Sequence, residues 1–110
     1  MTEASVQTLD WRTSPLDLNL RGMNGKRFRF RCPAGKPAPE LVVGSGLYTD
    51  ASSICSAAAH AGVIDAGLGG VVAIQILQGQ RSYAGSMQNF IRSQGYAQPW
   101  GGSFAVLSAN

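Results

Sequence analysis

Residues 48–64 read YTDASSICSAAAHAGVI, and this stretch decides the fold. Its centre consists of alanines and other short side chains, which have good helix propensity. Either Asp50 or Ser52 is suited to cap the start of such a helix, because a side-chain oxygen there accepts from unpaired backbone N–H groups. Gly62 is suited to the position just after its C-terminus. The stretch therefore predicts one short helix.

The predicted helix is apolar around most of its circumference. At about 100° per residue, three polar side chains (Ser53, Ser56 and His60) share one narrow stripe. The wider remaining surface is formed by Ile54, Cys55, Ala57, Ala58, Ala59 and Ala61. A helix of this kind is enclosed by other elements. We expect it at the centre of the fold.

Short strand patterns surround this helix. The clearest is Arg27–Cys32, which follows the turn signal Asn24-Gly25 and alternates strictly between arginines and apolar residues. Three weaker patterns predict strands at 41–43, 71–77 and 103–107, with a hairpin turn at 79–81. Residues 63–64 are expected to begin either a strand or a return segment. We therefore predict a single small α+β domain over residues 11–110, in which antiparallel sheets enclose an alanine-rich helix. Residues 1–10 are expected to form a flexible tail.

Composition restricts the class of protein. The chain has 110 residues, of which 45% are apolar and 14% charged, as in globular domains. No apolar run approaches the roughly 18–20 residues of a membrane span. The start, MTEASVQTLDW, has neither the basic nor the apolar region of a signal peptide. The two cysteines, Cys32 and Cys55, permit either one disulfide or two buried free thiols.

Positive charge is concentrated in one segment. Six of the nine basic residues lie between positions 21 and 36, where there is no acidic residue. Alternation places Arg27, Arg29 and Arg31 on one strand face, with Lys26 and Lys36 beside them. This face is a candidate site for a polyanionic ligand. The alternative is a solvated strand face whose charges prevent aggregation.

Catalytic and metal sites are poorly supported. His60, the single histidine, is either a general base or a hydrogen-bonded core residue, and its place on a buried helix favours the core. Ser56 and His60 are neighbours at four residues' spacing, but no nucleophile-elbow motif accompanies them. Cys55 and His60 do not face each other. Two cysteines and one histidine at these spacings match no zinc pattern. We expect no enzyme, metal or cofactor.

The central stretch resembles the signature of the LCCL domain family. The resemblance is carried by a tyrosine, a Ser-x-Ile-Cys helix start and an Ala-Ala-x-His-x-Gly-Val-Ile close, here Tyr48, Ser53, Ile54, Cys55, Ala57, Ala58, His60, Gly62, Val63 and Ile64. Flanking residues, including Arg21-Gly22, Cys32-Pro33, Ser82-Tyr83 and Trp100, follow the family's order. The likeness covers about residues 11–107.

The resemblance implies a central helix wrapped by antiparallel sheets and a module of secreted or surface proteins. It also implies binding of lipopolysaccharide, polysaccharide or protein partners, without catalysis. Many animal members have four cysteines in two bridges, whereas this chain has two and looks like bacterial members. If Cys32 and Cys55 are bridged, we expect a secreted, periplasmic or cell-surface location.

Three functions follow as hypotheses. The first is binding of an anionic glycan or lipid headgroup through the arginine face. The second is docking of a protein partner, with Tyr83, Phe90 or Tyr96 as exposed anchors; Asn89-Phe90-Ile91 stands where the family usually has Asn-Gly-Ile. The third, weaker, hypothesis is binding of nucleic acid. The ligand and the oligomeric state do not follow from the sequence.

Overall fold

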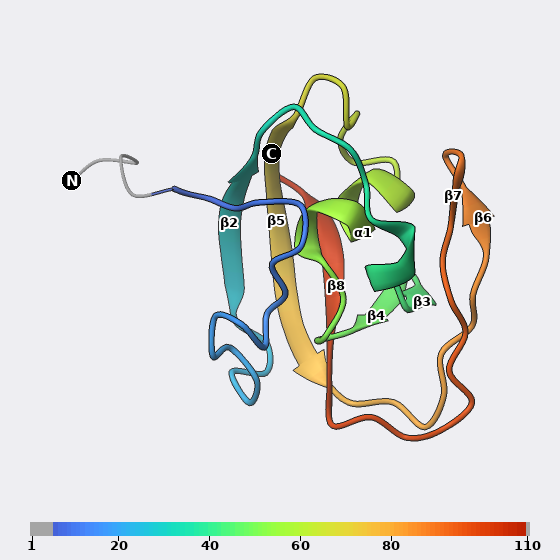
Figure 1. Ribbon diagram of the computed structural model, residues 1–110. Coiled ribbons are helices and arrows are strands. Elements are labelled where there is room, and N and C mark those ends of the chain that lie inside the picture. The colour runs from blue at the N-terminus through green and yellow to red at the C-terminus, as the bar shows by residue number, and fades with distance from the viewer. Residues whose placement is uncertain (1–5, 110) are drawn as a thin grey trace.

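A computed structural model describes residues 6–109 and shows one α+β domain, as predicted (Figure 1). Its one α-helix within these residues is α1 (Ile54–His60), and a 3₁₀ helix covers Pro39–Leu41. The strands are β1 (Gln7–Thr8), β2 (Arg27–Cys32), β3 (Gly44–Ser45), β4 (Leu47–Thr49), β5 (Gly70–Gln78), β6 (Met87–Gln88), β7 (Ile91–Arg92) and β8 (Gly102–Ser108). They form a six-stranded sheet in the order β1-β2-β5-β8-β4-β3 and a separate β6–β7 hairpin.

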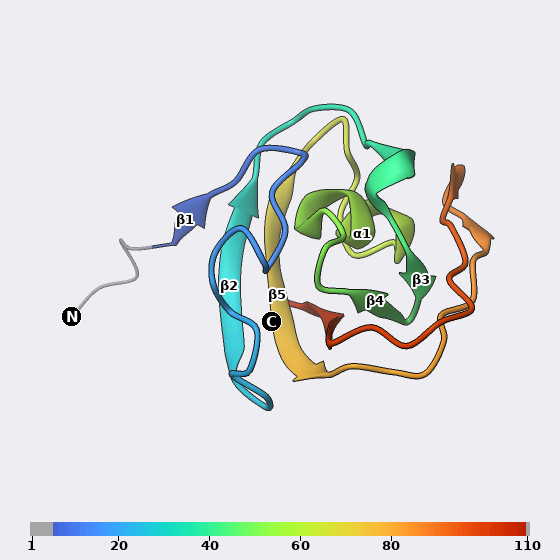
Figure 2. The same ribbon diagram turned by 60° about the horizontal axis from the view of Figure 1, so that its bottom comes forward.

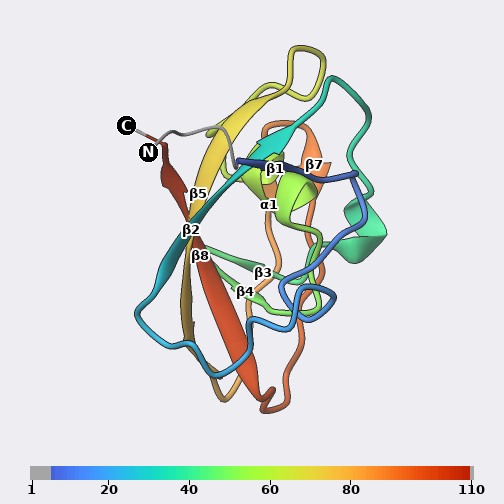
Figure 3. The same ribbon diagram turned by 90° about the vertical axis from the view of Figure 1, so that its left-hand side faces the viewer.

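The sheet curves around α1. In Figure 2 the six strands form an arc with the helix inside it, and Figure 3 shows α1 on one side of the β2–β5–β8 layer. Strands β2 and β8 both pair antiparallel with β5, whereas β1 pairs parallel with β2. The sheet is therefore mixed at this edge rather than wholly antiparallel. Its other face has no helix over it within residues 6–109.

The helix is buried along its whole length, as its composition predicted. All seven residues of α1 are buried, because alanines allow the surrounding backbone to approach closely. The N-cap is Ser53, whose hydroxyl accepts from the N–H of Ser56 at 3.1 Å. The prediction of Asp50 or Ser52 as the cap was therefore wrong.

The end of the helix confirms the role predicted for Gly62. Its φ is +82°, and its N–H donates to the carbonyl of Ala59 at 3.1 Å. The N–H of Val63 donates to the carbonyl of Ala58 at 3.0 Å, which completes a Schellman motif. Glycine adopts this left-handed backbone without the penalty that a side chain adds. Of the two alternatives for residues 63–64, the strand is absent, and these residues form the segment that leads away from the helix.

Two further predictions were wrong. Residues 41–43 form no strand: a 3₁₀ helix opened by Pro39 takes in Leu41, and β3 begins only at Gly44. No hairpin forms after Gly79, because both edges of β5 already pair with β2 and β8. In contrast, strands were correctly predicted at 27–32, 71–77 and 103–107.

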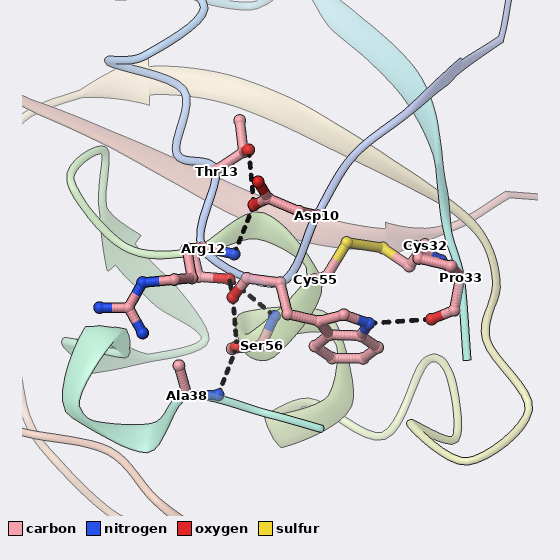
Figure 4. The surroundings of a disulfide bond; sticks show 10 residues. Asp10, Arg12, Thr13, Cys32, Pro33, Ala38, Cys55 and Ser56 are labelled. Atoms are coloured by element: carbon pink, nitrogen blue, oxygen red, sulfur yellow. Dashed lines mark hydrogen bonds between the residues drawn. A yellow bond between two sulfur atoms is a disulfide. The ribbon is translucent and has the colours of Figure 1, made fainter. Parts of the chain in front are cut away.

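A disulfide between Cys32 and Cys55 joins β2 to α1 (Figure 4). The indole of Trp11 donates to the carbonyl of Pro33, the residue after Cys32, at 2.9 Å. The carbonyl of Trp11 accepts from the hydroxyls of Ser53 and Ser56, at 2.7 and 3.2 Å. The buried hydroxyl groups at the start of the helix therefore find their hydrogen-bond acceptor in the segment that contains Trp11.

The N-terminal segment contributes to the fold before residue 11. Gln7 and Thr8 pair with Phe30 and Arg31, and Leu9 is buried. Gln7 and Thr8 are therefore part of the sheet, and Leu9 is part of the core. The flexible tail predicted for residues 1–10 falls, in its first half, on residues 1–5, which lie outside the described part of the chain.

Candidate anion-binding face

The basic residues of β2 lie on the exposed side of the sheet. Arg27, Arg29 and Arg31 are exposed, whereas Phe30 and Cys32 point to the core and are buried. The alternation follows from the pleat of a strand, which sends successive side chains to opposite faces. Lys26, just before the strand, and Lys36, in the loop after it, are exposed as well.

The strands on either side of β2 supply no negative charge to this face. Across the sheet Arg27, Arg29 and Arg31 are paired with Gln75, Ala73 and Val71. Strand β5, GVVAIQILQ, contains no acidic residue, and neither does β1. Cross-strand ion pairs with these neighbours therefore do not neutralise the arginines. The positive charges of this face come from β2, and β1 and β5 add no carboxylate to it.

The motif residues Tyr48, Ile54 and His60 are fully buried. The Tyr48 hydroxyl lies 2.9 Å from His60 Nδ1, and His60 Nε2 lies 3.2 Å from the carbonyl oxygen of Ser86. Because a carbonyl only accepts, Nε2 donates to Ser86, and Nδ1 shares the other hydrogen bond with the hydroxyl of Tyr48. Burial raises the pKa of Tyr48. These groups link the helix to β4 and to the segment before β6.

The serine and histidine of the helix do not form a catalytic pair. The hydroxyl of Ser56 donates to the carbonyl of Trp11 and accepts from the N–H of Ala38, at 2.9 Å (Figure 4). The ring of His60 instead contacts the hydroxyl of Tyr48 and the carbonyl of Ser86. Ser56 and His60 therefore serve the packing of α1.

One cluster was not found by sequence reasoning. The carboxylate of Asp50 is buried and accepts from Arg21 Nε and Nη2 at 2.7 and 2.8 Å. It also accepts from the indole of Trp100 at 2.7 Å, and Arg21 lies 5.7 Å from the centroid of that ring. The hydrogen bond to Asp50 raises the pKa of Arg21. Trp100, which we expected only as a motif residue, thus helps to hold a buried charge.

The three candidate anchors differ in exposure. Tyr83 is buried, and its hydroxyl lies 2.6 Å from the Ser103 hydroxyl, so its prediction as an exposed anchor was wrong. Tyr96 is exposed and packs edge-on against Trp100. Phe90 is 101% exposed.

Residues 6–109 contain no cluster of three or more histidine, cysteine or acidic side chains that would suit a metal ion. Within the same residues, no helix has the length and apolarity that crossing a membrane requires.

Comparison with known proteins identifies the family. The LCCL domain profile matches residues 9–104. The chain is 40% identical to mouse (Mus musculus) vitrin over 83 residues, which are 74% of this chain and 12% of vitrin. It is 45% identical to guinea pig (Cavia porcellus) cochlin over 76 residues, 68% of this chain and 14% of cochlin. The chain belongs to the LCCL domain family.

Another relative is human (Homo sapiens) cysteine-rich secretory protein LCCL domain-containing 2, 39% identical over 75 residues, 64% of this chain and 15% of the relative. The match therefore spans about one-seventh of the length of these relatives. In each of them the LCCL domain is one module of a larger protein.

Proposed function

We propose that this domain is a non-catalytic recognition module that binds a polyanionic glycan or a lipopolysaccharide-type ligand through the exposed face of β2. The observation that carries the proposal is the row of Arg27, Arg29 and Arg31, which are all exposed on one face of the strand. The flanking strands add no carboxylate to it.

The spacing of the row suits a repeating anion. Alternate residues of a strand are about 6.6 Å apart, so three guanidinium groups form a line of evenly spaced positive charges. Guanidinium binds phosphate, sulfate and carboxylate groups through paired hydrogen bonds. Lys26 and Lys36 would extend the positive field at the two ends of the strand. Binding of this kind weakens as salt screens the charges.

A nucleic-acid ligand is the weaker alternative. Single-stranded nucleic acids are bound by aromatic side chains that stack on the bases. The aromatic residues of β2, Phe28 and Phe30, alternate with the arginines and point to the opposite face, where their rings lie 6.5 Å apart. The arginine face itself contains no aromatic platform within β2.

We further propose that the domain works outside the reducing cytoplasm. The disulfide between Cys32 and Cys55 is typical of oxidising compartments. One relative is named a secretory protein. A secreted, periplasmic or cell-surface protein of which this domain is one module fits both observations.

An amide chemical-shift titration tests the proposed ligand. The domain is titrated with lipopolysaccharide fragments, heparin and a short single-stranded DNA, each at low and high salt. We expect saturable, salt-sensitive shifts at residues 26–36, larger with heparin or lipopolysaccharide fragments than with DNA. Shifts that are absent, or that do not saturate at these residues, would exclude the anion-binding face. A preference for DNA would instead support the nucleic-acid alternative.

A further inference from the structure

The turn between β6 and β7 has an unusual residue at its tip. Asn89 and Phe90 have φ angles of +52° and +67°, as a two-residue type I′ hairpin requires. Asparagine tolerates this region, whereas a bulky side chain is rarely found there and strains the backbone. Since Phe90 is 101% exposed, no packing within the described chain offsets the strain.

Phe90 stands at the rim of a groove. The groove has a volume of about 590 Å³ and runs between the hairpin turn and the segment that follows α1. Figure 1 shows both elements at the same end of the molecule. Its lining includes Ala59, Val63, Ile64, Asp65, Phe90 and Ile91. The side chain of Asn89 donates to the carbonyl of His60 at 2.8 Å and so fixes the hairpin against the helix.

The lining combines three kinds of contact. Most of it is apolar, Phe90 supplies an aromatic ring, and Asp65 is the single charged residue. The N–H of Gly67 donates to Asp65 Oδ1 at 2.7 Å, which orients the carboxylate. An ionised carboxylate has about four acceptor positions, so this bond leaves capacity for a ligand.

Together these groups match the side chain of lysine or arginine. Such a side chain has an apolar stem, which packs on apolar walls, and a charged head. The head is attracted both to the face of an aromatic ring and to a carboxylate. A purely apolar ligand would make no use of the remaining acceptor positions of Asp65, and an anionic ligand would be repelled by its carboxylate.

We propose that this groove docks a lysine or arginine side chain of a partner protein, with Phe90 on the stem and head and Asp65 as the counter-charge. No residue of β2 lines the groove, and its preference of charge is opposite to that of the arginine face. It does not depend on the function proposed for that face. On this account the strain at Phe90 persists because the ring acts in docking.

Selection from a displayed library of random peptides tests the proposal. The intact domain is the target, and peptides that also bind Phe90→Gly are removed. We expect the selected peptides to carry lysine or arginine. Their dissociation constants should rise about tenfold in Phe90→Gly and in Asp65→Asn, since each variant removes one of the two groups that contact the head.

The matched control is Met87→Ser. Met87 is exposed on the same hairpin but does not line the groove, so the peptides should bind this variant within about twofold of the parent domain. Heparin binding should be the same in the parent and in Phe90→Gly, which separates this surface from the β2 face.

Three results would overturn the proposal. The first is a selection in which no peptide distinguishes the parent from Phe90→Gly. The second is a set of peptides without basic residues. The third is binding to phosphatidylglycerol vesicles that Phe90→Gly abolishes and Asp65→Asn leaves intact, which would assign Phe90 to a lipid surface instead.

Discussion

Arg21 holds the buried carboxylate of Asp50 from 29 positions away, through hydrogen bonds of 2.7 and 2.8 Å. This pair connects the loop before β2 to the residue that directly follows β4. Trp100 donates to the same carboxylate and so adds the segment before β8. Glycine at 102 is required here, since a Cβ would collide with the carboxylate of Asp50. The carboxylate of Asp50 therefore connects three segments that lie far apart in the sequence.

Removing Arg21 should destabilise the domain. The substitution Arg21→Ala leaves the Asp50 carboxylate buried with fewer donors, at a cost of about 2 kcal/mol in the free energy of unfolding. This is less than for a fully buried pair, because the Arg21 side chain is 42% exposed. Urea unfolding measures the loss. The control is Arg12→Ala, which breaks the exposed pair with Glu40 and should cost under about 0.5 kcal/mol. Equal losses in the two variants would contradict the role of the cluster.

Loss of the disulfide should destabilise the fold further. Cys32 and Cys55 are 23 positions apart, and the double substitution to serine should cost about 3 kcal/mol by freeing the unfolded chain. The expected result in thermal unfolding is a lower midpoint for the double variant, and a parent midpoint that falls to a similar extent with reductant. A parent domain that is insensitive to reductant would indicate free thiols.

The Tyr48 hydroxyl should make stability sensitive to alkaline pH. Burial raises the pKa of Tyr48 in the folded state, above the value of about 10 for the unfolded chain. Below pH 10 both states keep the proton and the stabilisation is complete. At higher pH the unfolded state binds fewer protons, so the free energy of unfolding falls as pH rises through the folded pKa. Tyr48→Phe should flatten this alkaline fall, as urea unfolding between pH 8 and 11 would show; an unchanged fall would place its origin elsewhere.

Phe90→Gly should stabilise the domain by about 1 kcal/mol, because glycine adopts the positive φ of the β6–β7 turn without strain. Phe90→Ala keeps a Cβ and hence the strain. It serves as the control and should leave the free energy of unfolding nearly unchanged, since the Phe90 ring is fully exposed. Thermal unfolding of the three proteins compares them. A destabilised glycine variant would mean that the ring stabilises the fold.

The elements predicted from the sequence are those with local patterns. Strand β2 follows from the alternation of arginine and phenylalanine, and the burial of α1 follows from its alanines and from Gly62 after it. The arginine face could be predicted for the same reason, since alternation alone assigns its residues to one side of a strand.

The features that escaped prediction depend on partners far away in the chain. Asp50 was considered as a helix cap, but its partners Arg21 and Trp100 lie 29 and 50 positions away. The burial of Tyr83 was missed because its hydroxyl, besides accepting from the N–H of Gln80, contacts the hydroxyl of Ser103 in β8, 20 positions away. The groove beside Phe90 is formed only when the hairpin packs against the end of α1.

The most direct test of the account is the affinity for heparin at low salt of two triple variants with the same net charge. One carries Arg27→Ser, Arg29→Ser and Arg31→Ser; the other carries Arg12→Ser, Arg81→Ser and Arg92→Ser, none of which belongs to β2. Calorimetry should show that the first variant binds at least about tenfold more weakly than the parent, and the second within about threefold. Equal weakening of both would mean that net charge, and not the arginine row, attracts the anion, and would contradict the account.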